Sequence, residues 1–307
     1  MKKFIFSRLL QSVIVVWLVY TVTFWLLMAT PGDPFIGKKQ PPPAVLAALR
    51  RRYDLNKGDF HAYLAYGWRI IAHGDFGPTI SYANWTVLDV IRNSLPVSVA
   101  LGAMALLIAL WLGVAAGLLG AVYRGRWPDI VLTIGTLLGI SLPTFVIGSG
   151  LLMLFAVELA ILPSGGWGTL RELILPAFTL AVVFLAYLAR LSRASTLDVL
   201  SSDFVRTARA KGLPPMKVIA GHVLPNASIA VLAFLGPATA NVLTGSFIVE
   251  KIFAIPGLGE VFVNACLDKD IPLVLGIVLV YTVLLVLMNL LVDIACAMAD
   301  PRIKLSH

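Results

Sequence analysis

Residues 271–292 read Ile-Pro-Leu-Val-Leu-Gly-Ile-Val-Leu-Val-Tyr-Thr-Val-Leu-Leu-Val-Leu-Met-Asn-Leu-Leu-Val, and none of them is charged. A helix needs about 20 apolar residues to span the hydrocarbon core of a bilayer, which is about 30 Å thick. In lipid every backbone polar group must be paired within the protein, and a helix pairs them within its own segment. This stretch therefore predicts a transmembrane helix.

Five more charge-free windows predict further spans. The shortest window, which ends just before Arg190, is expected to continue as a helix until that side chain reaches the interface. The window that follows Lys2, Lys3 and Arg8 is longer than the apolar part of a signal peptide, so we expect an uncleaved first span. The five windows are Leu9–Gly32, Asn93–Tyr123, Ile130–Val157, Leu173–Ala189 and Val218–Val249.

The composition of the whole chain agrees with a membrane protein. Of its 307 residues, 59% are hydrophobic and 13% are charged, whereas soluble domains carry about 25% charged residues. This excludes an ordinary soluble enzyme, and it excludes a disordered chain because disorder requires low hydrophobicity and high charge. The sequence predicts an all-α integral membrane protein with six transmembrane helices.

The spans divide the chain into three predicted parts. Residues 1–30 form an N-terminal transmembrane helix, and residues 31–96 form an extracytoplasmic loop subdomain. Residues 97–307 form a five-helix core that carries a cytoplasmic loop at residues 190–225. Within the long first loop, Pro-rich Gln40–Pro43 precedes a helix-like stretch, Ala44–Tyr53.

The positions of Lys and Arg predict the orientation. With a cytoplasmic N-terminus, the inside segments hold 13 of these residues and the short outside loops hold three. Cytoplasmic loops carry the excess of positive charge, so both termini are expected inside. Because the cations flank apolar runs, the net charge of +8 indicates membrane lipid and no nucleic acid as the partner.

Sites for chemistry are not visible in this chain. The stretch Gly32-Asp-Pro-Phe-Ile-Gly-Lys-Lys39 has Lys39 where a phosphate-binding loop needs a hydroxyl for Mg²⁺. The four histidines and two cysteines have no metal-ligand spacing. We therefore expect a non-enzymatic protein with no catalytic residue, metal or cofactor of its own.

Small residues and prolines within the spans predict close helix packing and breaks. Gly113-x-x-x-Gly117 and Gly135-x-x-x-Gly139 place glycines on one helix face, which favours intramolecular packing. Pro143, Pro176 and Pro237 fall inside or near spans. Breaks of this kind are tolerated where they are buried in protein or line a cavity.

The segment Arg190–Pro225 is the longest predicted cytoplasmic connection. Ser195–Lys211 is expected to form one helix, because Leu197, Leu200, Phe204, Ala208 and Lys211 follow one another in steps of three to four residues. Gly212 is expected to end it in a left-handed cap, and Pro214 prevents continuation. A second helix, Met216–Val223, completes a compact projection onto which a moving soluble partner could dock.

This segment resembles the coupling loop of ABC-importer permeases. The family pattern is Glu-Ala-Ala, three residues, Gly, nine residues, then Ile-x-Leu-Pro. Phe204-Val-Arg-Thr-Ala-Arg-Ala-Lys-Gly212 and Leu224-Pro225 match its spacing. Departures at Arg206, Thr207 and His222 suit the peptide-importer branch. The resemblance implies that the ATPase-coupling residues are Arg206, Thr207, Ala208, Arg209, Gly212, Leu213, His222, Leu224 and Pro225.

Three other stretches carry the same resemblance in the right order. They are Ala29–Phe35, His73–Gly77 and Ile255–Gly259 continuing to Asp270–Val274. Together they resemble the B-type transmembrane subunit of an oligopeptide or dipeptide importer. This implies the type I ABC-importer permease fold in a bacterial cytoplasmic membrane.

The resemblance also implies a set of partners. They are a homologous second permease, two ATPase subunits that bind ATP and Mg²⁺, a periplasmic or lipid-anchored peptide-binding protein, and the peptide itself. The nearest alternative is a related importer branch for nickel, glutathione or sugars. A self-sufficient secondary transporter should show internal repeats and paired intramembrane charges, which are not seen in the sequence.

Overall fold

A computed structural model describes residues 2–29, 58–82 and 84–299. All the regular elements in these ranges are helices, accompanied by one isolated bridge between Pro78 and Thr86. Several predictions lie outside the described residues. They concern the phosphate-loop-like stretch 32–39, most of Ala29–Phe35, the Pro-rich stretch, the helix Ala44–Tyr53 and the C-terminal cations.

The chain divides into two compact units, residues 1–98 with 256–286 and residues 99–255 with 287–307. The first unit contains α1 (Lys2–Met28), α3 (Asp59–His73), α11 (Leu258–Asp268) and the first parts of α4 (Val87–Val122) and α12 (Ile271–Ala299). Its core joins α1, α3 and α12 through Tyr20, Phe24, Ala62, Tyr63, Tyr66, Leu275 and Leu279.

A buried carboxylate fastens the loop before α4 to the start of α12. Asp270 is fully buried, and its Oδ2 accepts hydrogen bonds from the Thr79 hydroxyl, from Ile80 N at 2.8 Å and from Ser81 N at 2.9 Å. Its Oδ1 accepts from Leu273 N at 3.2 Å. Asp270 therefore caps α12 and fixes the Thr79–Ser81 turn with one side chain.

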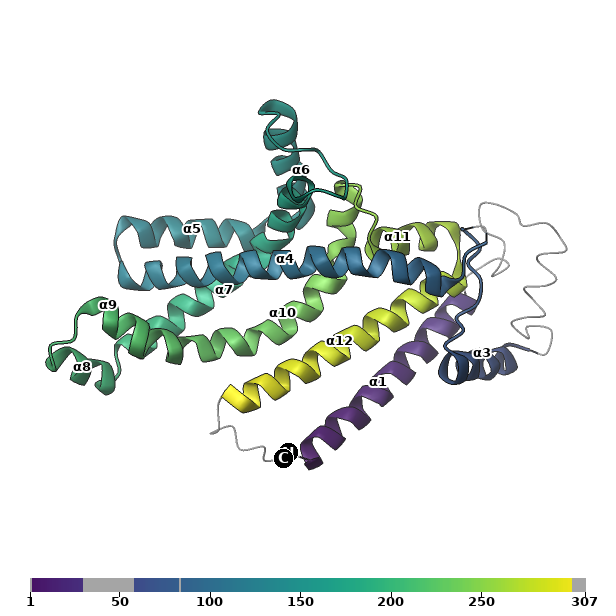
Figure 1. The fold of residues 1–307 in the computed structure, drawn as a ribbon, viewed down its shortest axis with the longest axis horizontal. Helices are drawn as coiled ribbons and strands as arrows, with labels where there is room; N and C mark the ends of the chain where they lie inside the picture. Colours follow the sequence, from purple (N-terminus) through teal and green to yellow (C-terminus); the bar gives the residue numbers. More distant parts are fainter. Residues whose placement is uncertain (1, 30–57, 83, 300–307) are drawn as a thin grey trace. The chain divides into compact units, whose positions relative to one another are not determined.

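The second unit is built around α7 (Leu170–Leu200), a 31-residue helix that begins with a capping box between Thr169 and Glu172. It packs against α5 (Trp127–Ser141), α6 (Thr144–Leu152) and α10 (Leu224–Ile252). Figure 1 shows α5 running back alongside the second part of α4. Two short helices, α8 (Asp203–Ala210) and α9 (Pro215–Val218), connect α7 to α10.

Five helical segments are long and apolar enough to cross a membrane, and they correspond to five of the six predicted windows. They are Ser7–Met28, Val87–Val122, Leu170–Leu200, Pro215–Gly236 and Ile271–Leu291. The expected extension of the shortest window is confirmed, because α7 continues past Arg190 to Leu200.

The sixth predicted span, Ile130–Val157, is broken at Pro143, one of the prolines expected to interrupt a span. It consists of α5 and a second piece, Thr144–Glu158, bent by 108°. Leu142 has an extended backbone (φ −82°, ψ 132°) directly before Pro143. A residue before proline is disfavoured in the helical region, and proline has no N–H to donate, so the helix ends here.

Helix α4 starts inside the predicted extracytoplasmic loop, residues 31–96. It begins at Val87 and continues through Pro96, so the last ten residues of that predicted loop are helical. Thr86 and Asp89 fix this start, since Thr86 N donates to Asp89 Oδ2 at 3.0 Å and Asp89 N donates to the Thr86 hydroxyl at 3.2 Å.

The predicted intramolecular packing is confirmed for the first glycine pair. A Cβ atom at Gly117 would clash with the Ala189 carbonyl oxygen and lie 2.6 Å from Ser192 Cβ, while one at Gly113 would lie 2.8 Å from Leu188 Cβ. Both glycines therefore let α4 approach α7 closely. In the second pair, Gly139 faces α7, whereas Gly135 has no neighbour for a Cβ within 4 Å.

Candidate functional site

The predicted coupling residues lie in a helical hairpin between α7 and α10, residues 201–225, which we call the α8–α9 hairpin. The sequence predicted one helix over Ser195–Lys211, but α7 ends at Leu200 and α8 starts at Asp203. The Ser201 hydroxyl donates to Asp198 O at 2.8 Å and the Ser202 hydroxyl to Val199 O at 2.6 Å. Such serine bonds to nearby carbonyls compete with helix continuation, which explains the break.

Gly212 ends α8 in the predicted left-handed conformation, with φ +78°. Leu213 N donates to Ala208 O at 3.3 Å, and Gly212 N donates to Arg209 O at 2.9 Å. These two bonds form a Schellman motif, which satisfies carbonyls that the helix end would leave unpaired. The predicted glycine cap is therefore confirmed.

The hairpin has a small core of its own. Val205 and Ala208 from α8 are buried together with Val218 of α9 and Val223, and Val199 and Leu200 pack against them. Of the predicted site residues, Ala208 therefore lies inside the hairpin. The core makes the two short helices one packed body, although neither is long enough to be stable alone.

The break before α8 changes which of its side chains are exposed. The predicted helical periodicity ran through Phe204, but Phe204 is 47% exposed and the neighbouring Val205 is fully buried. The helical spacing counted from Leu197 does not apply to α8, because the chain leaves the helix at Ser201 and Ser202 and a new helix starts at Asp203. The spacing of Val205 and Ala208, three residues apart, was the signal for the true inner face.

The outer surface of the hairpin combines apolar and basic side chains. Phe204, Leu213 and Met216 are exposed large apolar residues, and Arg206, Thr207, Arg209, Lys211 and Lys217 are exposed as well. Arg206 pairs with Asp203 at 3.5 Å, but both side chains are largely in solvent. Exposed pairs contribute about 0–1 kcal/mol, so this one leaves Arg206 available to a partner. Sequence reasoning did not assign Phe204 and Met216 to the site.

The remaining predicted residues lie where the hairpin returns to α10. His222 is half-buried in a π-helical turn, Ile219–Val223, and its carbonyl accepts from Asn226 Nδ2 at 2.7 Å. Leu224 and Pro225 form the first turn of α10, where proline needs no N–H partner. They connect the hairpin directly to a membrane-spanning helix.

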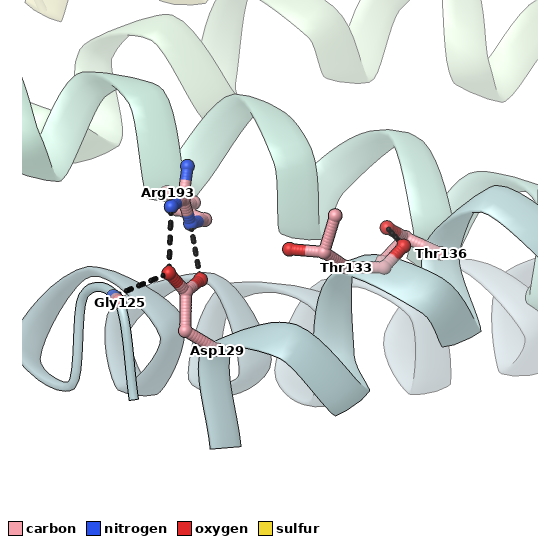
Figure 2. A network of polar contacts seen from close by, with 5 residues as sticks. All are labelled: Gly125, Asp129, Thr133, Thr136 and Arg193. Atoms are coloured by element: carbon pink, nitrogen blue, oxygen red, sulfur yellow. Dashed lines mark hydrogen bonds and ion pairs between the residues drawn. The ribbon is translucent and has the colours of Figure 1, made fainter. Parts of the chain in front are cut away.

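A partly buried ion pair fixes the C-terminal part of α7 to the start of α5, and sequence reasoning missed it. Arg193 Nε lies 2.6 Å from Asp129 Oδ1, and Arg193 Nη2 lies 2.8 Å from Asp129 Oδ2 (Figure 2). Gly125 N donates to the same carboxylate at 2.9 Å. Such a bidentate pair also fixes relative orientation, so the segment of α7 that leads into the hairpin is tied to the α4–α5 turn.

A metal site is not apparent in the ranges that the structure describes. In these ranges no three His, Cys, Asp or Glu side chains are grouped as metal ligands would be. The exposed side of the α8–α9 hairpin is a suitable surface for a partner protein, and the Asp129–Arg193 pair holds the adjacent part of α7 in place.

Five continuous candidate spans, one span broken at a proline and a packed hairpin between two spans define a multi-pass α-helical membrane protein. The chain belongs to the family described as "Binding-protein-dependent transport system inner membrane component", whose model matches residues 109–305. The N-terminal model of the same kind of membrane component matches residues 1–102. The chain is therefore a multi-pass inner-membrane protein of this family.

Named relatives align over almost the whole chain. The oligopeptide transport system permease protein OppB of Salmonella typhimurium is 40% identical over 307 residues, covering 99% of this chain and 100% of the relative. The dipeptide transport system permease protein DppB of Bacillus subtilis is 38% identical over 305 residues, covering 99% of each.

Solved structures support the type I importer fold. An inward-facing MetNI methionine ABC transporter aligns with a TM-score of 0.54 at 17% identity, over 69% of this chain and 97% of that chain. An amino acid ABC transporter with histidines aligns with a TM-score of 0.51 at 17% identity, over 70% and 95%.

Proposed function

We propose that the chain is the transmembrane permease subunit of an ATP-driven importer of oligopeptides or dipeptides. The observation that carries the proposal is the identity of about 40% over the whole chain to permeases named for these substrates. Peptide import is favoured over nickel, glutathione or sugar import because both groups of relatives are named for peptide transport.

The proposed complex contains a homologous second permease and two ATPase subunits, which bind ATP and Mg²⁺. The α8–α9 hairpin is the proposed docking element for one ATPase. Its exposed Phe204 and Met216 supply apolar area, and Arg206 and Arg209 supply positive charge around it. Apolar anchors surrounded by polar side chains are typical of the centres of protein interfaces.

The proposed mechanism is alternating access. Closure of the ATPases on ATP moves the hairpin as one body because its core joins α8 to α9. The movement then reaches α5 through the Asp129–Arg193 pair and reaches α10 through Leu224 and Pro225. The spans switch the cavity between inward-open and outward-open states.

The proposed orientation places both termini and the hairpin inside. A peptide-binding protein docks outside on the loop before α4 and on the Glu250–Asp270 region. Tyr82 and Trp85 are partly exposed there, with ring centroids 6.4 Å apart. Burial raises the pKa of Tyr82, and the negative charges of Glu260, Asp268 and Asp270 raise it further.

Co-purification tests the composition of the complex. The tagged chain is co-expressed with a homologous permease, two ATPases and a peptide-binding protein from one transport system. We expect stoichiometric recovery of the second permease and the ATPases, with ATPase activity that rises on addition of peptide-loaded binding protein. A chain that purifies without ATPase subunits and transports on its own would contradict the proposal.

A further inference from the structure

Helix α3 has apolar side chains on two separate faces. One face carries Ala62, Tyr63 and Tyr66, which are buried in the core of the first unit. A second face carries Phe60, Leu64, Trp68 and Ile71, which are 64%, 51%, 67% and 83% exposed. A helix that only covered a core would need the first face alone.

The four exposed residues form one continuous stripe. Their spacing of four, four and three residues places them on the same side of a helix. His61 and Ala72, also exposed, lie beside the stripe on its polar edge. A stripe of four large apolar side chains on a 15-residue helix indicates a surface that is covered in the assembled protein.

The stripe is joined to the exposed surface of α1 by a series of aromatic rings. The Tyr20 hydroxyl donates to Tyr63 O at 2.6 Å, which holds α3 against α1. The Tyr63 ring stacks on Trp25 at a centroid distance of 6.3 Å and on Phe60 at 6.2 Å. The series Trp25–Tyr63–Phe60 thus leads from α1 into the stripe of α3.

The surface of α1 at this point is apolar and exposed, as expected of a span that faces lipid. This span is only 11% buried, and its exposed side chains include Val22, Trp25 and Leu26. Trp25 lies three residues before the end of α1, and tryptophan is enriched at the level of lipid headgroups. Figure 1 shows α3 beside this end of α1.

We propose that α3 lies in the membrane–water interface, with the stripe Phe60–Ile71 inserted at the boundary between headgroups and acyl chains. An amphipathic helix binds an interface through its buried apolar area, with added attraction to anionic lipids where it is basic. The partner here is the lipid surface itself. Insertion would hold the loop between α1 and α4 at a fixed height above the bilayer.

The charges of α3 indicate which lipids it needs. Its single Arg, Arg69, pairs with Asp75 at 2.5 Å, and Asp59 adds a negative charge. The helix therefore has no excess of positive charge, and insertion depends on apolar area. The depth at which α3 inserts should therefore be the same in zwitterionic and in anionic bilayers, and it should not depend on the salt concentration. This inference does not depend on the transported substrate.

Spin-label accessibility tests the inference in the assembled complex in lipid nanodiscs. Cys266→Ser and Cys296→Ser remove the native thiols, and single cysteines replace Leu64 or Ile71 on the stripe and His61 or Ala72 on the polar edge. For each label, the ratio of its collision rate with oxygen to its collision rate with a water-soluble nickel complex is measured. We expect this ratio to be severalfold higher for the stripe labels than for the edge labels, in zwitterionic and in anionic bilayers.

Two results would overturn the inference. Stripe labels as accessible to the nickel complex as edge labels would mean that the stripe faces water. Immobilised stripe labels shielded from both reagents would mean that a protein partner covers it. All four positions are exposed, so substitution should not disturb folding, and gel filtration of each variant checks this.

Discussion

Gly212 is the residue at which the α8–α9 hairpin should be most sensitive to an added side chain. A Cβ there would have no neighbour within 4 Å, so any cost comes from φ +78° and not from crowding. A left-handed conformation costs an L-residue about 1–2 kcal/mol, but Asn tolerates it. We expect Gly212→Asn to keep most of the peptide-stimulated ATPase activity of the complex and Gly212→Val to lower it severalfold, with both variants inserted normally. Equal, full activity in the two variants would show that the turn does not transmit the signal.

Asp270 is the second residue with a sharply testable role, because one buried carboxylate holds the Thr79–Ser81 turn and caps α12. Asp270→Ala leaves several buried donors unpaired, at about 1–3 kcal/mol for each. Asp270→Asn retains one acceptor oxygen and should therefore destabilise the protein less than Asp270→Ala. We expect the thermal unfolding midpoint in detergent to fall in the order wild type, Asn, Ala, with faster proteolysis near residue 80 in the Ala variant. Proteolysis at the wild-type rate in Asp270→Ala would disprove the fastening role.

At the scale of elements, the two glycine pairs provide a matched test of helix packing. Gly117→Ala forces a Cβ into the Ala189 carbonyl of α7, whereas Gly135→Ala meets open space. Alanine also favours a helix over glycine by about 1 kcal/mol. Gly117→Ala should therefore lower the unfolding temperature of the purified chain, and Gly135→Ala should leave it unchanged or raise it. An equal fall of the unfolding temperature in both variants would show that α4 and α7 do not pack as they do in this structure.

The helices also show which features of the fold could be predicted from the sequence and which could not. Apolar length is a local property, so five spans were predicted correctly, and the Gly212 cap followed from the prolines after it. The predicted helical spacing does not continue into α8, because the Ser201 and Ser202 hydroxyls bond to carbonyls at the end of α7 and the helix stops there. The bend at Leu142 agrees with the break expected at Pro143, which disfavours a helical conformation in the residue before it. By contrast, the Asp129–Arg193 and Thr79–Asp270 contacts join residues 64 and 191 positions apart, which no local pattern in one sequence reveals.

At the scale of the whole molecule, the orientation in the membrane decides which face meets which partner. In a chain with Cys266→Ser and Cys296→Ser, we expect Leu267→Cys to react with an impermeant maleimide in intact cells. Lys211→Cys, on the hairpin, should react only after permeabilisation. Both positions are exposed, so a difference reports sidedness and not burial. Labelling of Lys211→Cys from outside would reverse the proposed topology.

The central claim is that this chain forms half of a peptide pathway driven by ATP hydrolysis in partner subunits. Its most direct test is uptake of a labelled oligopeptide into proteoliposomes that contain the purified complex. We predict accumulation only when ATP and Mg²⁺ are enclosed and the peptide-binding protein is outside, with loss of uptake when either is omitted. Peptide uptake by this chain without ATPase subunits, driven by an ion gradient alone, would contradict the account.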